Sequence, residues 1–259
     1  MKKVGLALGG GAAHGVAHFG VIQVLKENGI PIDYIAGCSA GAIVGGMYST
    51  GSDMYMAAKL AENIDMASFI DITIPKMGFI RGKKAENLVD ILVKGKNIEE
   101  CEPPFCAIAC DVISGRCDTF KSGKISKACH ASFAMPGIFE PVEIDGKQYI
   151  DGGSMIRVPI DQVRQMGAEY IIAVDVGYQG WGHKKAENLM DVLLFAFDMC
   201  DWQIVEKMYE TADCVINPDL RDIPIKSLEK SKECLELGRS ATEKMIEKIK
   251  SDLIINEIK

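Results

Sequence analysis

The sequence predicts an α/β fold of three layers, in which helices cover both faces of a mostly parallel central sheet. Short apolar runs of strand length alternate with longer segments of helical periodicity through nearly all of the 259 residues. The apolar runs are continuous, without the polar alternation of a half-exposed strand, which is typical of strands buried on both faces. Neither an internal repeat nor a Pro/Ser-rich linker divides the chain, so we predict a single domain over residues 1–259.

The first elements surround two glycine turns. An apolar run at residues 4–8 stops at the glycines of residues 9–11, and apolar residues then recur at helical spacing up to Leu25. A second apolar run, residues 32–36, enters a turn at Gly37. In chain order, the remaining predicted elements are helices at 40–48, 54–64 and 85–93, paired strands at 105–112 and 117–120, a hairpin of 142–144 with 148–150, a strand at 170–176, a helix at 187–211, a short strand at 213–216 and a helical stretch at 228–249.

The charge of the chain limits which kinds of molecule it can bind. A net charge of −7 and a pI near 5.2 leave no excess of basic side chains to neutralise phosphates, so we expect no nucleic-acid partner. By the same reasoning, a transient contact with an anionic membrane surface would have to be mainly apolar.

Nine cysteines lie scattered through the expected strands and helices, so we interpret them as reduced thiols. Cys106 and Cys110 have no histidine or second cysteine pair nearby, so we expect no structural zinc. Two lysines followed by apolar residues at the N-terminus imitate a secretory signal, but a strand running into a glycine turn explains them as well. No apolar stretch is long enough to span a bilayer, and we expect a cytoplasmic protein.

The stretch Gly37-Cys38-Ser39-Ala40-Gly41 has the Gly-x-Ser-x-Gly pattern of a nucleophile elbow. The strained backbone of such a turn needs small neighbours on both sides of the serine, as Gly37 and Gly41 are. The pattern is common by chance, but its position between an apolar strand and a helix makes it more specific. Free N–H groups at the helix start also favour negative charge near Ser39, so we predict that Ser39 is the nucleophile.

A serine hydroxyl needs a neighbouring base to accept its proton. None of the four histidines follows a late strand where a Ser-Asp-His hydrolase would place one; they are His14, His18, His130 and His183. Asp151 is the alternative base, because desolvation raises the basicity of a carboxylate and Gly152 and Gly153 leave room for close approach. A turn aspartate without a catalytic role explains the same residues equally well.

The loop Gly9-Gly10-Gly11 can supply backbone N–H groups to the oxyanion of an acyl-transfer reaction. The rival interpretation is a dinucleotide-binding turn. Its spacing requires a glycine where this chain has His14, and the second strand ends in Gly37 instead of an acid that could bind ribose.

Taken together, the glycine loop, Gly-x-Ser-x-Gly and Asp-Gly-Gly, in this order, resemble the patatin-like phospholipase family, particularly its small bacterial single-domain members. The stretch from Ala131 to Val142 also looks like the family segment that precedes the aspartate, and the resemblance covers about residues 4–176. It implies a patatin-like α/β/α fold and a Ser–Asp dyad. The resemblance implies that Ser39 is the nucleophile and Asp151 the base. It also implies that the oxyanion hole is formed by Gly9, Gly10, Gly11 and Ala12, and that the turns are supported by Gly37, Gly41 and Gly152.

Of two histidines near the glycine loop, one departs from the family pattern and one matches it. His14 stands where family members often have an arginine, which leaves anion binding at the loop open. His18 matches a histidine of the family's first helix, where we expect it to pack.

We therefore expect a hydrolase that cleaves carboxylic esters of lipids without a metal or organic cofactor. Two alternatives stay open: a Ser–His acyltransferase or thioesterase using His130 or His183, and a non-catalytic module that binds a phosphate or nucleotide at the glycine loop. Residues 66–82 are apolar without a regular period, and we interpret them as a flap that contacts the acyl chain or as a loop packed on the core. Helices within 187–259 either complete the fold or form a homodimer interface.

Overall fold

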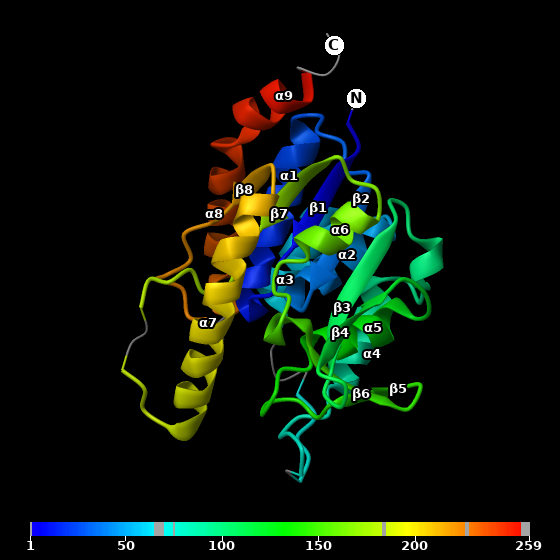
Figure 1. The fold of residues 1–259 in the computed structure, drawn as a ribbon, viewed down its shortest axis with the longest axis vertical. Helices are drawn as coiled ribbons and strands as arrows, with labels where there is room; N and C mark the ends of the chain where they lie inside the picture. The colour runs from blue at the N-terminus through cyan, green and yellow to red at the C-terminus, as the bar shows by residue number, and fades with distance from the viewer. Residues whose placement is uncertain (1, 65–69, 75, 183–184, 226–227, 255–259) are drawn as a thin grey trace.

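The computed structural model describes residues 2–64, 70–74, 76–182, 185–225 and 228–254 (Figure 1). Its main elements, in chain order, are β1 (Val4–Leu8), α1 (Ala17–Glu27), β2 (Tyr34–Cys38), α2 (Ala40–Ser49), α3 (Met54–Asn63), α4 (Lys83–Leu92), β3 (Phe105–Asp111), β4 (Arg116–Phe120), α5 (Ile125–Phe133), β5 (Val142–Ile144), β6 (Lys147–Asp151), α6 (Ile160–Gln165), β7 (Tyr170–Val174), α7 (Leu189–Met208), β8 (Cys214–Ile216), α8 (Ser231–Glu243) and α9 (Ile246–Ile254).

The strands form one sheet in the order β5-β6-β3-β2-β1-β7-β8, with β4 also paired to β3. Pairings among β3, β2, β1, β7 and β8 are parallel, whereas the pairs β3–β4, β3–β6 and β5–β6 are antiparallel. Every residue of β1, β3 and β7 is buried, as continuous apolar runs predict for strands covered on both faces. The predicted mostly parallel α/β sheet is confirmed.

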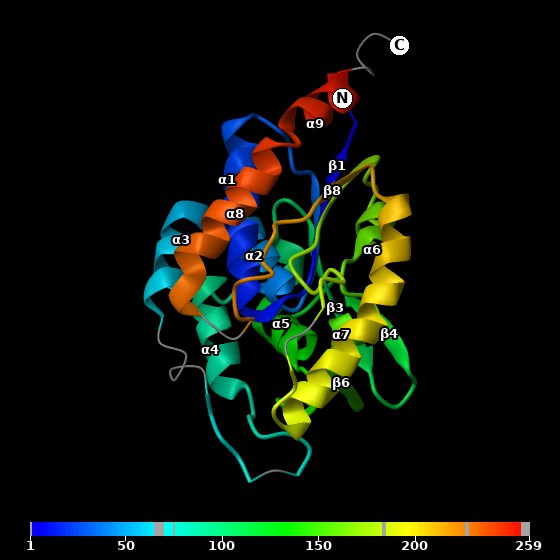
Figure 2. The ribbon, with the colours of Figure 1, turned by 90° about the vertical axis from the view of Figure 1, so that its left-hand side faces the viewer.

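Helices cover the sheet on both sides (Figure 2). The larger core cluster joins one face to α1, α2, α3, α4, α5, α8 and α9, and a second cluster joins the other face to α6 and α7. On the first side, α8 lies directly on α1. A Cβ at Gly20 would come within 2.2 Å of the Leu235 carbonyl oxygen, and one at Gly238 equally close to that of Ala17. The two helices therefore approach closely because glycines stand where they cross.

The register of β3 brings the ends of β2 and β6 together. A strand has two edges, and β4 occupies one of them along the whole stretch from Ala107 to Asp111. Both β2 and β6 must therefore pair with the opposite edge, where Cys38 is paired with Ile108 and Asp151 with the next residue, Ala109. This arrangement places Asp151 beside the residue that follows β2, which is Ser39.

Two short helices were not predicted, and one strand begins later than expected. The helices are α5 and α6, and β2 spans Tyr34–Cys38 where the pattern predicted residues 32–36. The other predicted helices and strands are present with ends shifted by a few residues, and the helical stretch at 228–249 is divided into α8 and α9. Within the part of the chain that is described, no helix has the length and apolar character needed to cross a bilayer.

The interpretation of all nine cysteines as reduced thiols is wrong for two of them. Cys110 and Cys117 form a disulfide with their Cα atoms 3.9 Å apart. They occupy directly opposed positions of β3 and β4, so the strand register itself brings the two sulfur atoms together. The other seven cysteines are free.

Candidate active site

Ser39 lies on a sharp turn between β2 and α2 with φ 52° and ψ −121°. A non-glycine residue rarely adopts this conformation, and the surrounding packing must hold it there. A Cβ at Gly37 would lie 2.5 Å from the Gly41 carbonyl oxygen, and one at Gly41 would lie 2.2 Å from that of Leu8. Both glycines are therefore required by the close packing of the turn against its neighbours.

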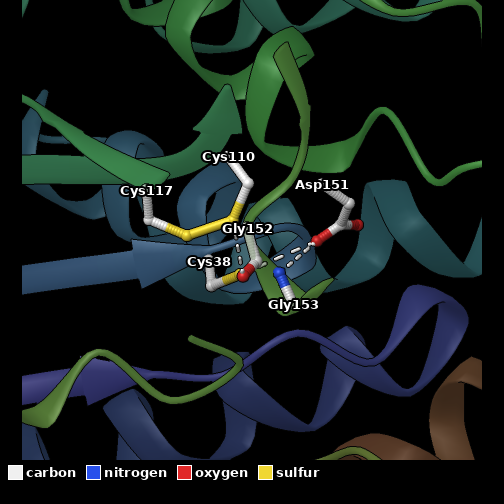
Figure 3. Close-up of a disulfide and its surroundings, with 6 residues drawn as sticks. All are labelled: Cys38, Cys110, Cys117, Asp151, Gly152 and Gly153. Atoms are coloured by element: carbon white, nitrogen blue, oxygen red, sulfur yellow. Dashed lines mark hydrogen bonds between the residues drawn. A yellow bond between two sulfur atoms is a disulfide. The ribbon is translucent and has the colours of Figure 1, made fainter. Parts of the chain in front are cut away.

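The Ser39 hydroxyl donates a hydrogen bond of 2.7 Å to Asp151 Oδ2. The other carboxylate oxygen, Oδ1, accepts from the Gly153 N–H at 2.7 Å and lies 3.7 Å from Cys38 Sγ (Figure 3). Only 7% of Ser39 and 3% of Asp151 are exposed. Burial raises the pKa of Asp151 to about 6, while its hydrogen bonds from Gly153, Ser39 and Cys38 act in the opposite direction.

Two residues that the sequence did not single out fix this pair. Ser132 on α5 accepts the Ser39 backbone N–H through its Oγ at 2.8 Å, which ties the turn to a helix 93 positions away. Burial raises the pKa of the Cys38 thiol far above its usual range, so the thiol faces Asp151 in its neutral form. Neither role has a local sequence signal, because each depends on a contact between distant segments.

The disulfide supports the segment that carries Asp151. Cys110 Sγ lies 3.6 Å from the Gly152 carbonyl oxygen. Figure 3 shows the disulfide beside Gly152. A Cβ at Gly152 would come within 2.5 Å of the Ile108 carbonyl oxygen and 3.0 Å of Cys38 Sγ. Gly152 thus fits closely between β3 and Cys38, which fixes the backbone immediately after Asp151.

The glycine loop offers fewer free donors than the sequence predicted. The Gly9 and Gly10 N–H groups donate to the backbone oxygens of Val174 and Arg157, at 2.9 and 3.1 Å. A backbone N–H has one hydrogen to donate, so in this conformation the donors of these two glycines are already engaged. Gly9 and Gly10 instead allow close packing: a Cβ at Gly10 would lie 3.2 Å from the Ser39 Cβ.

Gly11 and Ala12 are the members of the predicted oxyanion hole whose donors remain available. Neither N–H has an acceptor among the described residues, and both residues line the same pocket as Ser39 and Asp151. His18 contacts the glycine loop, because its Nε2 lies 2.8 Å from the Gly9 carbonyl oxygen. Burial lowers the pKa of His18 to about 4, so the ring is neutral and donates this bond.

The other histidines do not approach Ser39 where they can be placed. His14 is buried, with Nδ1 3.2 Å from the Val176 carbonyl oxygen and Nε2 2.8 Å from that of Ile223, and burial lowers the pKa of its ring. His130 faces Glu86 at 2.7 Å and the Arg81 carbonyl oxygen at 3.1 Å, so both of its ring nitrogens are occupied. His183 lies outside the described residues. A Ser–His pair therefore finds no support in His130.

A buried arginine that was not predicted lines the same pocket as Ser39 and Asp151. Arg157 lines the pocket of Ser39, and its guanidinium binds Asp175 at 2.8 Å and also Asp201 of α7. Tyr209 donates a hydrogen bond to Asp175 as well. Burial raises the pKa of Asp201 to about 7, and the Arg157 charge opposes this rise. The cluster joins the end of β7 to α7 and already neutralises the arginine, which leaves little charge for a phosphate ligand.

An apolar cavity of about 170 Å³ opens next to the dyad pocket. Ala12 borders both spaces, and Ala40, the residue after Ser39, lines the cavity. Its walls are almost entirely carbon and come from α1, α2, α3 and α4. No described residue between 66 and 82 is among those that line this cavity. Residues 66–69 and 75 lie outside the described residues.

The described residues contain no group of three or more His, Cys, Asp or Glu side chains arranged to hold a metal ion. The groups brought together at the pocket are a hydroxyl, a buried carboxylate and backbone donors. This combination can transfer an acyl group through a serine ester.

Comparisons with known proteins give the same family as the motifs. The family model of patatin-like phospholipases matches residues 6–164. An uncharacterized NTE family protein of Mycobacterium tuberculosis is 36% identical over 176 residues, which are 67% of this chain and 49% of that protein. The lysophospholipase NTE1 of Cryptococcus neoformans is 34% identical over 182 residues, 68% of this chain and 11% of that protein. The chain thus spans about half or less of these relatives.

Solved structures share the fold at low sequence identity. VipD of Legionella pneumophila superposes with a TM-score of 0.64 at 13% identity, covering 95% of this chain and 67% of that one. The type III effector ExoU superposes with a TM-score of 0.54 at 14% identity, covering 96% and 53%. Because the family model covers more than half of the chain and the relatives agree with it, the chain belongs to the patatin-like phospholipase family.

Proposed function

We propose that the chain is a serine hydrolase that cleaves carboxylic esters of lipids through a Ser39–Asp151 dyad. The observation that carries the proposal is the 2.7 Å hydrogen bond from a serine on a strained elbow to a buried carboxylate. Membership in the patatin-like phospholipase family and the name of the fungal relative, a lysophospholipase, support a lipid ester as the substrate.

The first half of the reaction forms an acyl-enzyme. Ser39 Oγ attacks the ester carbonyl carbon while its proton moves to Asp151 Oδ2, and the carbonyl oxygen gains the negative charge. The free N–H groups of Gly11 and Ala12 are the proposed donors to this oxyanion. When the carbonyl reforms, the alcohol departs with the proton from Asp151. A pKa of about 6 suits both steps, because the carboxylate is ionised at neutral pH and still basic enough to take a proton.

The second half returns the free enzyme. Water enters the place of the alcohol, gives a proton to Asp151 and attacks the acyl carbonyl, and the carboxylic acid leaves as Ser39 regains its hydrogen. During both halves the apolar cavity beside Ala12 and Ala40 would hold the acyl chain.

The test uses Ser39→Ala and Asp151→Asn, with Ser122→Ala at an exposed loop serine as the matched control. A fluorophosphonate probe should label the wild type and Ser122→Ala but not Ser39→Ala. Hydrolysis of a soluble p-nitrophenyl butyrate should fall by about 10³-fold in Asp151→Asn, as expected for loss of a general base. A folded Ser39→Ala protein that still hydrolyses the ester would overturn the dyad.

A further inference from the structure

The loop that precedes α4 has a fixed backbone. Within residues 70–74 and 76–84, Thr73 donates to the Phe79 carbonyl oxygen at 3.0 Å and Arg81 donates to that of Asp71 at 3.1 Å. The Phe79 N–H also donates to the Ile138 oxygen at 2.9 Å, and Ile80 and Phe139 form a bridge. These bonds hold the described part of the loop against the segment before β5.

The same loop presents large apolar side chains to solvent. Ile72 and Ile74 are 82% and 83% exposed, and Met77 and Phe79 are each more than half exposed. A single exposed apolar side chain needs no explanation, but four on one short loop form a patch of the kind that marks an interaction surface. The backbone bonds show that the loop holds its place without burying these side chains.

The charge of the loop is opposite to that of the chain. Residues 70–84 contain four basic residues and one acidic residue, Asp71, while the whole chain has a net charge of −7. The basic residues are Lys76 and Arg81 of the loop and Lys83 and Lys84 at the start of α4; all four are exposed, and Lys83 forms an ion pair with Glu86. Asp71 is engaged locally, because its carboxylate accepts the N–H groups of Gly82 and Lys83. The loop therefore combines apolar side chains with a local positive charge.

The loop and the start of α7 flank the entrance to the dyad pocket. Met135 lines that pocket, and the loop is bonded to Ile138 three residues later. On the other side of this segment, a Cβ at Gly137 would lie 4.0 Å from the methyl group of Met190 on α7. Figures 1 and 2 both show the loop and the beginning of α7 at the same end of the molecule. There α7 exposes Leu189, Val192 and Leu193 by more than half.

We infer that this rim docks onto an anionic lipid surface, with the apolar side chains of the loop and of α7 in the interface and the loop cations at the headgroups. The docking rim is defined by Ile72, Ile74, Met77 and Phe79 of the loop and Leu189, Val192 and Leu193 of α7. The inference rests on the proposed function for its substrate, since docking presents lipid esters to the pocket of Ser39. Apolar burial supplies the binding energy, and the cations select anionic headgroups.

The experiment measures co-sedimentation with phosphatidylcholine vesicles, with and without phosphatidylglycerol. The wild type should bind more tightly when phosphatidylglycerol is present, and added salt should weaken that binding. In Ile74→Ser/Phe79→Ser, vesicle affinity should fall about tenfold for each side chain removed. Lys76→Gln/Lys84→Gln should show a smaller preference for phosphatidylglycerol than the wild type, because two of the four cations are removed. The matched control is Ile91→Ser, which changes a 74% exposed isoleucine at the far end of α4 and should bind like the wild type.

Soluble-ester hydrolysis separates failure of docking from failure of the proposed function. All rim variants should hydrolyse p-nitrophenyl butyrate at the wild-type rate, and Ser39→Ala should bind vesicles normally. A wild type that does not bind either vesicle, or an Ile74→Ser/Phe79→Ser protein that binds as the wild type does, would refute docking even if Ser39 is the nucleophile. A dimer in light scattering that dissociates in this double variant would assign the rim to self-association and overturn the lipid inference.

Discussion

At the scale of single residues, the burial of Asp151 should lower the stability of the folded protein at neutral pH. Its pKa of about 6 in the folded protein lies above the ordinary 3.8, so folding disfavours the ionised form. Stability should therefore fall as pH rises from about 4 through about 6, and the deficit at pH 7.5 is about 3 kcal/mol. Asp151→Asn carries no charge at either pH, so we expect it to be more stable than the wild type at pH 7.5 but not at pH 4.

Urea unfolding of both proteins at the two pH values measures this effect. Asp145→Asn, in the exposed turn between β5 and β6, is the control and should follow the wild type. If Asp151→Asn loses stability with rising pH as steeply as the wild type, the deficit belongs to another group. Such a result would also remove the argument that desolvation makes Asp151 a base.

The sequence could predict the two residues of the proposed dyad but not the residues that hold them in place. Ser39 and Asp151 sit in short patterns with turn glycines, and the hairpin signal at Asp145-Gly146 places Asp151 at a strand end. Ser132 and Arg157 have no such local pattern, because their partners are 93 and 18 or more positions away. The glycine loop shows a different limit: a pattern predicts where N–H groups lie, but only the fold shows that Gly9 and Gly10 have already used theirs.

At the scale of elements, the buried cluster around Arg157 attaches α7 to the sheet. The guanidinium lies between Asp175, which follows β7, and Asp201 on α7, and it also donates to the Tyr178 carbonyl oxygen. Arg157→Met would leave two buried carboxylates without their cation, so we expect a loss of about 3–5 kcal/mol in the free energy of unfolding. Asp201→Asn should cost only about 1 kcal/mol, because with a pKa of about 7 this side chain is readily neutral.

Urea unfolding at neutral pH compares the two variants directly. Equal losses from Arg157→Met and Asp201→Asn would contradict the idea that the arginine compensates more than one carboxylate. Circular dichroism checks that both proteins keep their helices before unfolding.

Helices whose apolar residues recur at a clear helical spacing were predicted from the sequence, and helices without such spacing were missed. Residues of α3 and α4 show helical spacing because one side of each helix faces the core and the other faces solvent. In α5, all residues except Lys127 are buried, so the helix shows no polar side. The short helix α6 follows a proline and spans only Ile160–Gln165. The pairing of β3 with β4 was predicted, but its register was not, and the register determines that Cys110 meets Cys117.

At the scale of the whole molecule, the sheet separates two environments that meet at Ser39. Helices α1 to α4 enclose the apolar cavity on one side, while α7 and the Arg157 cluster lie on the other. The two meet at the carboxyl ends of β1 and β2, where the glycine loop and the elbow stand side by side. A lipid ester has the same division into an apolar chain and a polar head, and the opposed environments would orient it across the dyad.

This division predicts that filling the cavity changes chain-length preference without disturbing the chemistry. Ala61 on α3 lines the cavity and is partly exposed, so Ala61→Phe can place a ring there at small cost to folding. We expect kcat/KM for p-nitrophenyl palmitate to fall about tenfold or more, with little change for the butyrate ester, because only the long chain needs the filled volume. Ala241→Phe, on α8 and not part of the cavity wall, is the control and should keep the wild-type ratio. If the palmitate and butyrate rates fall together in Ala61→Phe, the acyl chain lies elsewhere, and the cavity between the four helices is only a packing gap.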